Sequence, residues 1–171
     1  MIITLIPLSI FIGLLVLLFM NMGYHNEQVP SPLIGKPVPA FELPLLYEDK
    51  TMTEQDFIGE PWLLNVWGSW CPNCLYEHPV VTELANSGLR VVGLNWKDEF
   101  TDADTWLKRL GNPYDVVLVD YKGNTAIDFG VYGAPESFLI DGNGVIVHKI
   151  IGELTPENVN NEILPRLEQL K

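Results

Sequence analysis

The chain has 171 residues, of which 22 are Asp or Glu and 10 are Lys or Arg, so that its formal net charge is −12. This acidity excludes a nucleic-acid-binding protein and a protein that docks on anionic lipid headgroups, because both need basic surfaces. The length fits one domain of ordinary size plus a short additional segment.

The additional segment is the apolar N-terminus. Residues 2–22 carry no charged side chain, and about 20 helical residues at roughly 1.5 Å each span the ~30 Å core of a bilayer. We therefore predict a transmembrane anchor over residues 1–22. The alternative is a cleaved signal peptide, but its apolar core is usually about 7–15 residues and its cleavage site contains small residues. The first alanine is Ala40, so no typical cleavage site follows the apolar run. The first Lys or Arg is Lys36, so charge does not define the orientation of the anchor in the membrane.

A proline-rich segment follows the predicted anchor. Its prolines are Pro30, Pro32, Pro37 and Pro39. Proline at this density favours an extended, semi-stiff chain. We predict a tether over residues 23–39 and one folded domain over residues 40–171.

The first half of the domain alternates strands and helices. The apolar run Trp62–Trp67 is short and lies between a proline and a glycine, as expected for a strand buried on both faces. A helix is predicted from Pro72 to about Ser87, because proline fits the first helical turn. The further elements are a strand over 89–94, a helix over 102–110 and a strand over 116–119.

The second half closes with a hairpin and a helix. The turn residues 141–144, Asp-Gly-Asn-Gly, lie between two apolar runs and predict a hairpin. Thr155 and Pro156 are typical of the start of a helix, which we expect to reach Leu170. This order predicts an α/β domain with a central mixed sheet and helices on both faces.

The only cysteines, Cys71 and Cys74, lie directly after the first predicted strand. The loop between them is too short for a disulfide to stabilise the fold appreciably. At the start of a helix, backbone N–H groups and the helix dipole lower the pKa of Cys71 and favour its thiolate. We therefore predict a redox-active Cys71–Cys74 disulfide, with Cys71 as the nucleophile and Cys74 as the resolving thiol.

Other uses of two cysteines in this spacing fit less well. A zinc site normally needs a second pair or two histidines, and only His78 lies near. A haem-attachment motif needs histidine directly after the second cysteine, where Leu75 stands. The redox interpretation needs no metal and no bound cofactor. A copper or zinc carrier that uses Cys71, Cys74 and His78 is the alternative from another functional class.

A second motif lies in residues 130–136. Pro135 follows glycines and Ala134 between two predicted strands, which favours a cis peptide bond in a tight turn. The strand, Trp70 and the cysteine pair, the distant Ala134-Pro135 and the closing hairpin and helix together resemble the thioredoxin fold over residues 40–171. In that fold, the cis-proline loop lies beside the cysteines and offers backbone groups to a substrate peptide.

Longer matches narrow the resemblance. Residues 71–79, 91–98, 110–114 and 130–144 are similar to the membrane-anchored thioredoxin-like proteins of cytochrome c maturation, the CcmG/DsbE family. The resemblance implies a protein-disulfide reductase that keeps the cysteines of apocytochrome c, or of a thiol partner, reduced for haem attachment. It implies a single-pass protein of the inner membrane with a periplasmic domain, reduced by a membrane electron carrier of the DsbD/CcdA type. A thiol–disulfide oxidoreductase of broader specificity is the alternative.

The resemblance also implies site residues. Glu77, three residues after Cys74, is expected beside the resolving thiol, where a carboxylate raises thiol pKa values and can shuttle a proton. Thioredoxins carry a buried aspartate where this chain has Asn65. An amide cannot act as a proton acceptor, so Glu77 would have to supply the acid–base function. The residues implied in substrate binding are Trp70, Pro72, Ala134, Pro135 and Glu136.

Simpler interpretations of these residues remain. Trp70 could fill the core, and Glu77 and Glu136 could be solvated. His78 fits a capping or surface residue, and the acidic run Asp98–Asp104 fits a solvated face.

Overall fold

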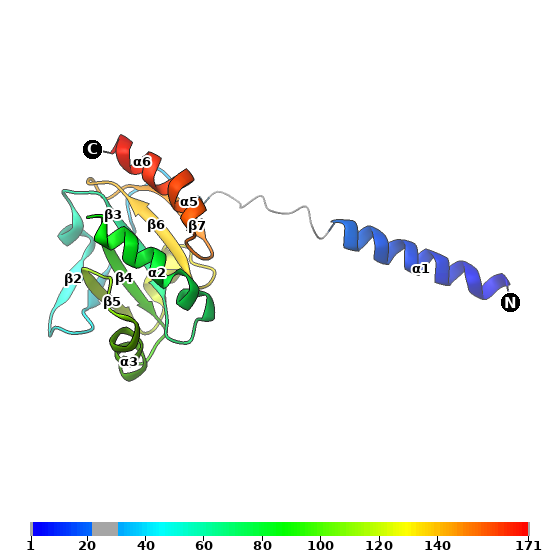
Figure 1. Cartoon of the computed structure of the whole chain (residues 1–171), viewed down its shortest axis with the longest axis horizontal. Helices are drawn as coiled ribbons and strands as arrows, with labels where there is room; N and C mark the ends of the chain where they lie inside the picture. Colours follow the sequence, from blue (N-terminus) through cyan, green and yellow to red (C-terminus); the bar gives the residue numbers. More distant parts are fainter. Residues whose placement is uncertain (1, 22–30, 171) are drawn as a thin grey trace. The chain divides into compact units, whose positions relative to one another are not determined.

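The computed structural model describes residues 2–21 and 31–170, and it divides the chain into two units, residues 1–30 and 31–171. The first unit contains helix α1 (Ile2–Asn21), which has no acidic residue in its first turn and no basic residue in its last (Figure 1). Within residues 2–21 and 31–170, no helix combines the length and the apolar character needed to cross a membrane. Residues 22–30, in which the predicted tether begins, lie outside the described residues.

The second unit is built on a mixed five-stranded sheet in the order β5-β4-β3-β6-β7 (Figure 1). The strands are β3 (Trp62–Trp67), β4 (Arg90–Trp96), β5 (Val116–Asp120), β6 (Glu136–Ile140) and β7 (Ile146–Ile151). Strands β3, β4 and β5 are parallel, whereas β6 is antiparallel to both β3 and β7. The strands predicted from the apolar runs are therefore confirmed.

The long helices lie where the sequence predicts them. They are α2 (Pro72–Asn86), α3 (Phe100–Leu110) and a C-terminal series of α5 (Pro156–Asn158), a π-helical turn η2 (Val159–Ile163) and α6 (Leu164–Gln169). The Thr155 side chain caps the C-terminal series by accepting from the Asn158 N–H at 3.2 Å, as predicted. The π-turn was not predicted. Pro165, at the start of α6, cannot donate a backbone hydrogen bond, which disfavours regular α-helical bonding just before it.

Strand β3 lies between two cores, because its side chains alternate between the faces of the sheet. Leu63 and Trp67 pack in one core with α2, α3 and the C-terminal helices. Trp62, Leu64 and Val66 pack in the other. All six residues of β3 are buried, which confirms the prediction of a strand covered on both faces.

The second face is covered mainly by elements that the sequence analysis missed. They are the hairpin of β1 (Glu42–Pro44) and β2 (Thr51–Thr53), the 3-10 turn η1 (Glu54–Phe57) and the short helix α4 (Asn124–Asp128). The prediction of helices on both faces is therefore only partly correct. This face carries the short helix α4, but the β1–β2 hairpin covers much of it. These elements have only three to five residues each, too few for a periodic pattern.

Part of the predicted tether is attached to the domain. The Gly35 N–H donates to the Ile146 carbonyl and the Val38 N–H to the Gly144 carbonyl, each at 2.8 Å, and the Ile146 N–H donates to the Lys36 carbonyl at 3.0 Å. The Val38 side chain is buried in the core on this face. The folded unit therefore begins by residue 31 rather than at residue 40, because the segment pairs with backbone groups at the edge of β7.

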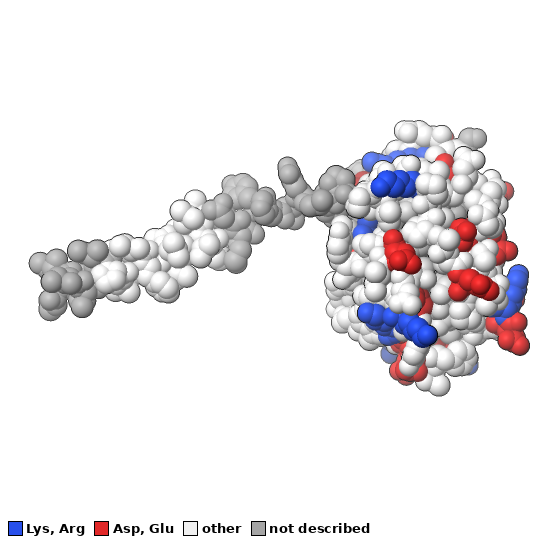
Figure 2. Space-filling view, turned by 180° about the vertical axis from the view of Figure 1, so that it is seen from behind, with Lys and Arg blue, Asp and Glu red and all other residues white. Residues whose placement is uncertain are grey.

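Charged residues of both signs are mixed on the surface. On the face shown in Figure 2, Lys and Arg side chains lie among Asp and Glu side chains and form no basic patch.

The attachment of residues 31–39 can be tested with two matched substitutions. Val38→Asp places an unpaired carboxylate in the core and should lower the free energy of unfolding by about 3 kcal/mol. Ile34→Asp is the control, because Ile34 is 40% exposed, and it should change that free energy by less than about 0.5 kcal/mol. Urea unfolding measures both values; equal effects would mean that this segment is not part of the fold.

Candidate active site

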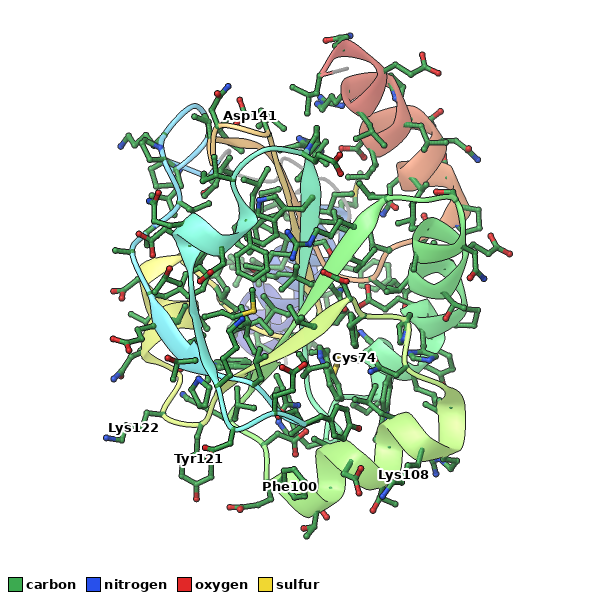
Figure 3. All side chains as sticks on the ribbon, turned by 90° about the vertical axis from the view of Figure 1, so that its left-hand side faces the viewer. Cys74, Phe100, Lys108, Tyr121, Lys122 and Asp141 are labelled. Atoms are coloured by element: carbon green, nitrogen blue, oxygen red, sulfur yellow. A yellow bond between two sulfur atoms is a disulfide. The ribbon has the colours of Figure 1, made fainter. Side chains whose placement is uncertain are left out.

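The cysteine pair lies where β3 ends and α2 begins, and a disulfide joins Cys71 to Cys74 with their Cα atoms 5.4 Å apart. Cys71 is the N-cap residue of α2, and its Sγ atom accepts from the Cys74 N–H at 3.1 Å. Pro72 occupies the first turn, as predicted. Both cysteines are buried in the core under α2. Figure 3 shows Cys74 toward the end of the domain that carries Phe100 and Tyr121, away from Asp141 in the hairpin turn.

Trp70 lies on the surface next to the cysteine pair. Its side chain is 49% exposed, so it does not fill the core. The indole Nε1 donates to the Trp96 carbonyl at 3.1 Å, and the two tryptophan rings meet at 60° with their centroids 5.6 Å apart. Trp70 therefore presents a fixed apolar surface directly before Cys71.

Asp98 is a residue of the site that the sequence analysis missed. Its carboxylate is buried and accepts from the Ser69 N–H at 2.6 Å, the Ser69 hydroxyl at 2.7 Å and the Asn95 side-chain amide at 2.9 Å. The interpretation of Asp98 as part of a solvated acidic face is wrong. These bonds join the loop before the cysteines to the end of β4. The available signal was the position of Asp98, two residues after the end of an apolar strand.

The loop before β6 brings a distant segment to the same end of the sheet. The Ala134–Pro135 peptide bond is cis, as predicted, and the Pro135 carbonyl accepts from the Gly152 N–H at 3.0 Å. Because β6 is antiparallel to β3, its first residue, Glu136, pairs with Val66 near the end of β3. The loop and the cysteine pair consequently lie at one end of β3.

Glu77 is buried beneath the site rather than solvated. Its side chain is 2% exposed. One carboxylate oxygen accepts from the Asn65 amide Nδ2 and the other from the Leu154 N–H, both at 2.8 Å. Burial raises the pKa of Glu77 to about 7, although these two hydrogen bonds oppose the rise. Since Glu77 follows Cys74 by one helical turn, a carboxyl group that titrates near neutral pH lies beside Cys74.

Asn65 connects Glu77 to two further buried groups. Its amide nitrogen donates to the Ser137 hydroxyl at 3.1 Å, and its amide oxygen accepts from the Tyr114 hydroxyl at 2.8 Å. Asn65 occupies the position of the thioredoxin aspartate. Its amide is hydrogen-bonded to Glu77, the carboxylate predicted to take over the acid–base function of that aspartate.

Glu136 lies on the opposite face of the sheet from Glu77. Its carboxylate is 1% exposed, forms an ion pair with the Lys149 ammonium at 2.8 Å and accepts from the Tyr132 N–H at 2.9 Å. Lys149 also donates to the Gly130 carbonyl at 2.8 Å. The solvated interpretation of Glu136 is therefore wrong. The structure places this carboxylate beneath the loop before Pro135, where it holds the backbone of the loop.

His78 packs inside the domain. Its ring meets Trp106 edge-on with the centroids 4.6 Å apart, and burial lowers its pKa. The interpretation as a surface residue is wrong. Within residues 2–21 and 31–170, no cluster of three His, Cys, Asp or Glu side chains could hold a metal ion.

Comparisons with known proteins agree with this geometry. Residues 33–163 match the Redoxin family model. The chain is 44% identical over 169 residues to the thiol:disulfide interchange protein DsbE of Pseudomonas aeruginosa, covering 98% of this chain and 94% of that protein. Its identity to the DsbE protein of Escherichia coli is 45% over 172 residues, covering 96% and 93%.

Solved structures give the same result. A DsbE-type thiol:disulfide interchange protein from Chlorobium tepidum has a TM-score of 0.63 at 28% identity, covering 80% of this chain and 95% of that one. A thioredoxin from Neisseria meningitidis has a TM-score of 0.66 at 28% identity, covering 77% and 89%. The domain therefore has the thioredoxin-like fold that the sequence predicts.

The raised pKa of Glu77 predicts a stability that falls as the pH rises. The unfolded carboxyl ionises near 4.5 and the folded one near 7, so the folded state binds the proton more tightly between these values. The stabilisation that Glu77 contributes is complete below about pH 4.5 and is lost as the pH rises through about 7. Its loss lowers the free energy of unfolding by up to about 3 kcal/mol.

Glu77→Gln should remove this dependence. Urea unfolding from pH 4 to pH 8 gives the free energy of unfolding of both oxidised proteins. The titration of His78 and His148 contributes equally to both and cancels in the difference between them. A difference that does not change across this range would mean that Glu77 ionises normally in the folded protein.

Proposed function

This chain belongs to the DsbE family of thiol:disulfide interchange proteins, and we propose that it reduces protein disulfides in the maturation of c-type cytochromes. It is a thiol–disulfide oxidoreductase whose only two cysteines form a disulfide at the start of a helix. That disulfide is the observation that carries the proposal. A bond that closes so short a loop contributes little to the fold, so that its value to the protein is chemical.

The reaction begins from the reduced pair. The Cys71 thiolate attacks one sulfur of the substrate disulfide, and the other substrate sulfur leaves as a thiolate that takes up a proton. Cys74 then attacks the Cys71 sulfur of the mixed disulfide and releases the second substrate thiol. Two electrons pass from the cysteine pair to the substrate, and the pair ends as the Cys71–Cys74 disulfide. The Cys74 N–H, which points at the Cys71 sulfur at 3.1 Å, stabilises the thiolate of Cys71.

Glu77 serves as the acid–base group for Cys74. The Cys74 thiol must lose its proton before it attacks, and the side chain is buried together with Glu77 on one face of α2. A carboxylate with a pKa of about 7 can accept that proton near neutral pH and release it later. Asn65 cannot do so, because an amide has no basic site of this strength.

The substrate binds as an extended peptide across the surface next to Cys71. Trp70 and Pro72 line one side, and the backbone of Ala134 and Pro135 lines the other. Glu136 contributes from beneath, since it bonds to the Tyr132 N–H and forms an ion pair with Lys149. We therefore propose that Glu136 holds the loop before Pro135 in place and does not itself contact the substrate.

The partners follow from the proposed pathway. The substrate is apocytochrome c or a thiol partner that holds its haem-attachment cysteines. The disulfide left on Cys71 and Cys74 is reduced again by a membrane electron carrier of the DsbD/CcdA type. Each turnover consumes one dithiol, so a continuous supply of electrons across the membrane is required.

We further propose that residues 1–22 anchor the protein in the inner membrane, with residues 31–171 on the periplasmic side. The support is the sequence of residues 2–22, which carries no charged side chain and is long enough to span a bilayer as a helix. Residues 23–30 then connect the anchor to the folded unit.

Trapping in the native host tests the pathway. Cys74→Ser removes the resolving thiol, so Cys71 should stay covalently joined to the protein that it attacks. Mass spectrometry of the adducts should identify apocytochrome c or a dedicated thiol partner. The matched control is Cys71→Ser, which keeps Cys74 and should trap little.

Each other result of the trapping has a defined meaning. Many unrelated periplasmic adducts would favour an oxidoreductase of broader specificity. No adduct at all would contradict thiol exchange and favour metal carriage, which mass spectrometry of the reduced protein with copper would reveal.

Membrane fractionation tests the anchor. The full chain should sediment with membranes and resist extraction at alkaline pH, whereas a chain that begins at residue 23 should be extracted. A thiol reagent that cannot cross membranes should label the reduced cysteines of intact spheroplasts. Recovery of a shortened chain in the soluble periplasm would instead indicate a cleaved signal peptide.

A further inference from the structure

Glu77 is one end of a buried chain of hydrogen bonds that begins at Tyr114. The Tyr114 hydroxyl donates to Asn65 Oδ1 at 2.8 Å. Asn65 Nδ2 then donates to Glu77 Oε1 at 2.8 Å and to Ser137 Oγ at 3.1 Å. All four residues are buried, so water does not compete for these bonds.

The Asn65 amide could face Glu77 in either of two orientations. In the observed one, its NH₂ group points at the carboxylate and stabilises the ionised form. Turned by half a rotation, it would present its oxygen, and only a protonated Glu77 could then donate to it. Ser137 fits both orientations, because a hydroxyl group can either donate or accept.

Tyr114 is the neighbour that distinguishes the two orientations. In the part of the chain that the structure describes, its hydroxyl hydrogen has an acceptor only while the amide oxygen points toward it, as it does here. Burial raises the pKa of Tyr114 well above its ordinary value, so the hydroxyl keeps this hydrogen. The ring is stacked on Trp67 at a centroid distance of 5.5 Å and an angle of 18°, which fixes its position.

We propose that Tyr114 is a positioning residue for thiol–disulfide exchange, because its hydroxyl locks the Asn65 amide in the orientation that donates to ionised Glu77. The inference rests on the proposed acid–base role of Glu77. The lock keeps the carboxylate available to accept the proton of Cys74 and opposes the burial that favours the neutral acid.

The test compares Tyr114→Phe with the unaltered protein, using the full chain in its oxidised form. Nuclear magnetic resonance of isotope-labelled glutamate follows the Glu77 carboxyl, and Glu77→Gln identifies its signal. Without the lock, the amide can turn and accept from protonated Glu77. The titration midpoint should therefore rise by about one pKa unit, a tenfold change in the protonation equilibrium.

Tyr121→Phe is the matched control. The Tyr121 hydroxyl also donates to a carboxylate, that of Glu99 at 3.0 Å, but the side chain is exposed and is not bonded to Asn65. Its loss should leave the Glu77 midpoint unchanged. Of the groups around Glu77, Cys74 does not titrate in the disulfide, and the nearby charge of Glu153 is the same in all variants.

A purely structural role for Tyr114 would give a different result. Tyr114→Phe would then lower the melting temperature and leave the Glu77 midpoint in place, which would overturn the proposal. If this variant does not fold, the amide orientation is measured in the unaltered chain instead. The Asn65 amide protons should stay close to Ser137 and Glu77 at every pH, and their approach to the Tyr114 ring at low pH would refute the lock.

Failure of the proposed function gives another signature. If Glu77→Gln left the pH profile of disulfide exchange unchanged, Glu77 would not be the acid–base group. A raised Glu77 midpoint in Tyr114→Phe would still demonstrate the lock.

Discussion

The complete burial of β3 is the constraint on which the rest of this structure depends. Its six residues supply side chains to two cores, and its backbone pairs with β4 on one side and β6 on the other. A strand held in this way cannot move without disrupting both cores. The cysteine pair begins four residues after β3 ends, so the reactive sulfurs follow directly on a strand that is buried in both cores.

Successive side chains of β3 and β6 point to opposite faces of the sheet, and this alternation decides the surroundings of their polar residues. Asn65 and Ser137 point to the face that carries α2, where Asn65 meets Glu77. Glu136, one residue before Ser137, points to the other face and meets Lys149. Two buried glutamates therefore have different chemistry. Among the described residues, the donors to Glu77 are neutral and its pKa is raised, whereas Glu136 has a cation against it.

The surroundings of the cysteine pair combine a fixed frame with an accessible surface. Asp98 holds Ser69, and the Trp96 carbonyl holds the indole of Trp70, so that the segment before Cys71 is bonded to the end of β4. Trp70 nevertheless remains half exposed, and the cis Ala134–Pro135 loop lies at the same end of β3. For the proposed exchange with a partner peptide, a surface that is held in place before binding lowers the cost of association.

The sequence by itself determined the central strand, the long helices, the hairpin and the identity of the reactive pair. Each of these depends on local information: an apolar run such as Trp62–Trp67, a proline in a first helical turn, or two cysteines in a fixed spacing. Only the tertiary structure decided the surroundings of the charged residues. Asp98, Glu77 and Glu136 are each buried by segments distant in sequence, and no local pattern encodes the donors that Ser69, Leu154 and Lys149 bring to them. The same holds for residues 31–39 and for the β1–β2 hairpin, because short segments become ordered only where a sheet edge or an open apolar face is available to bind them.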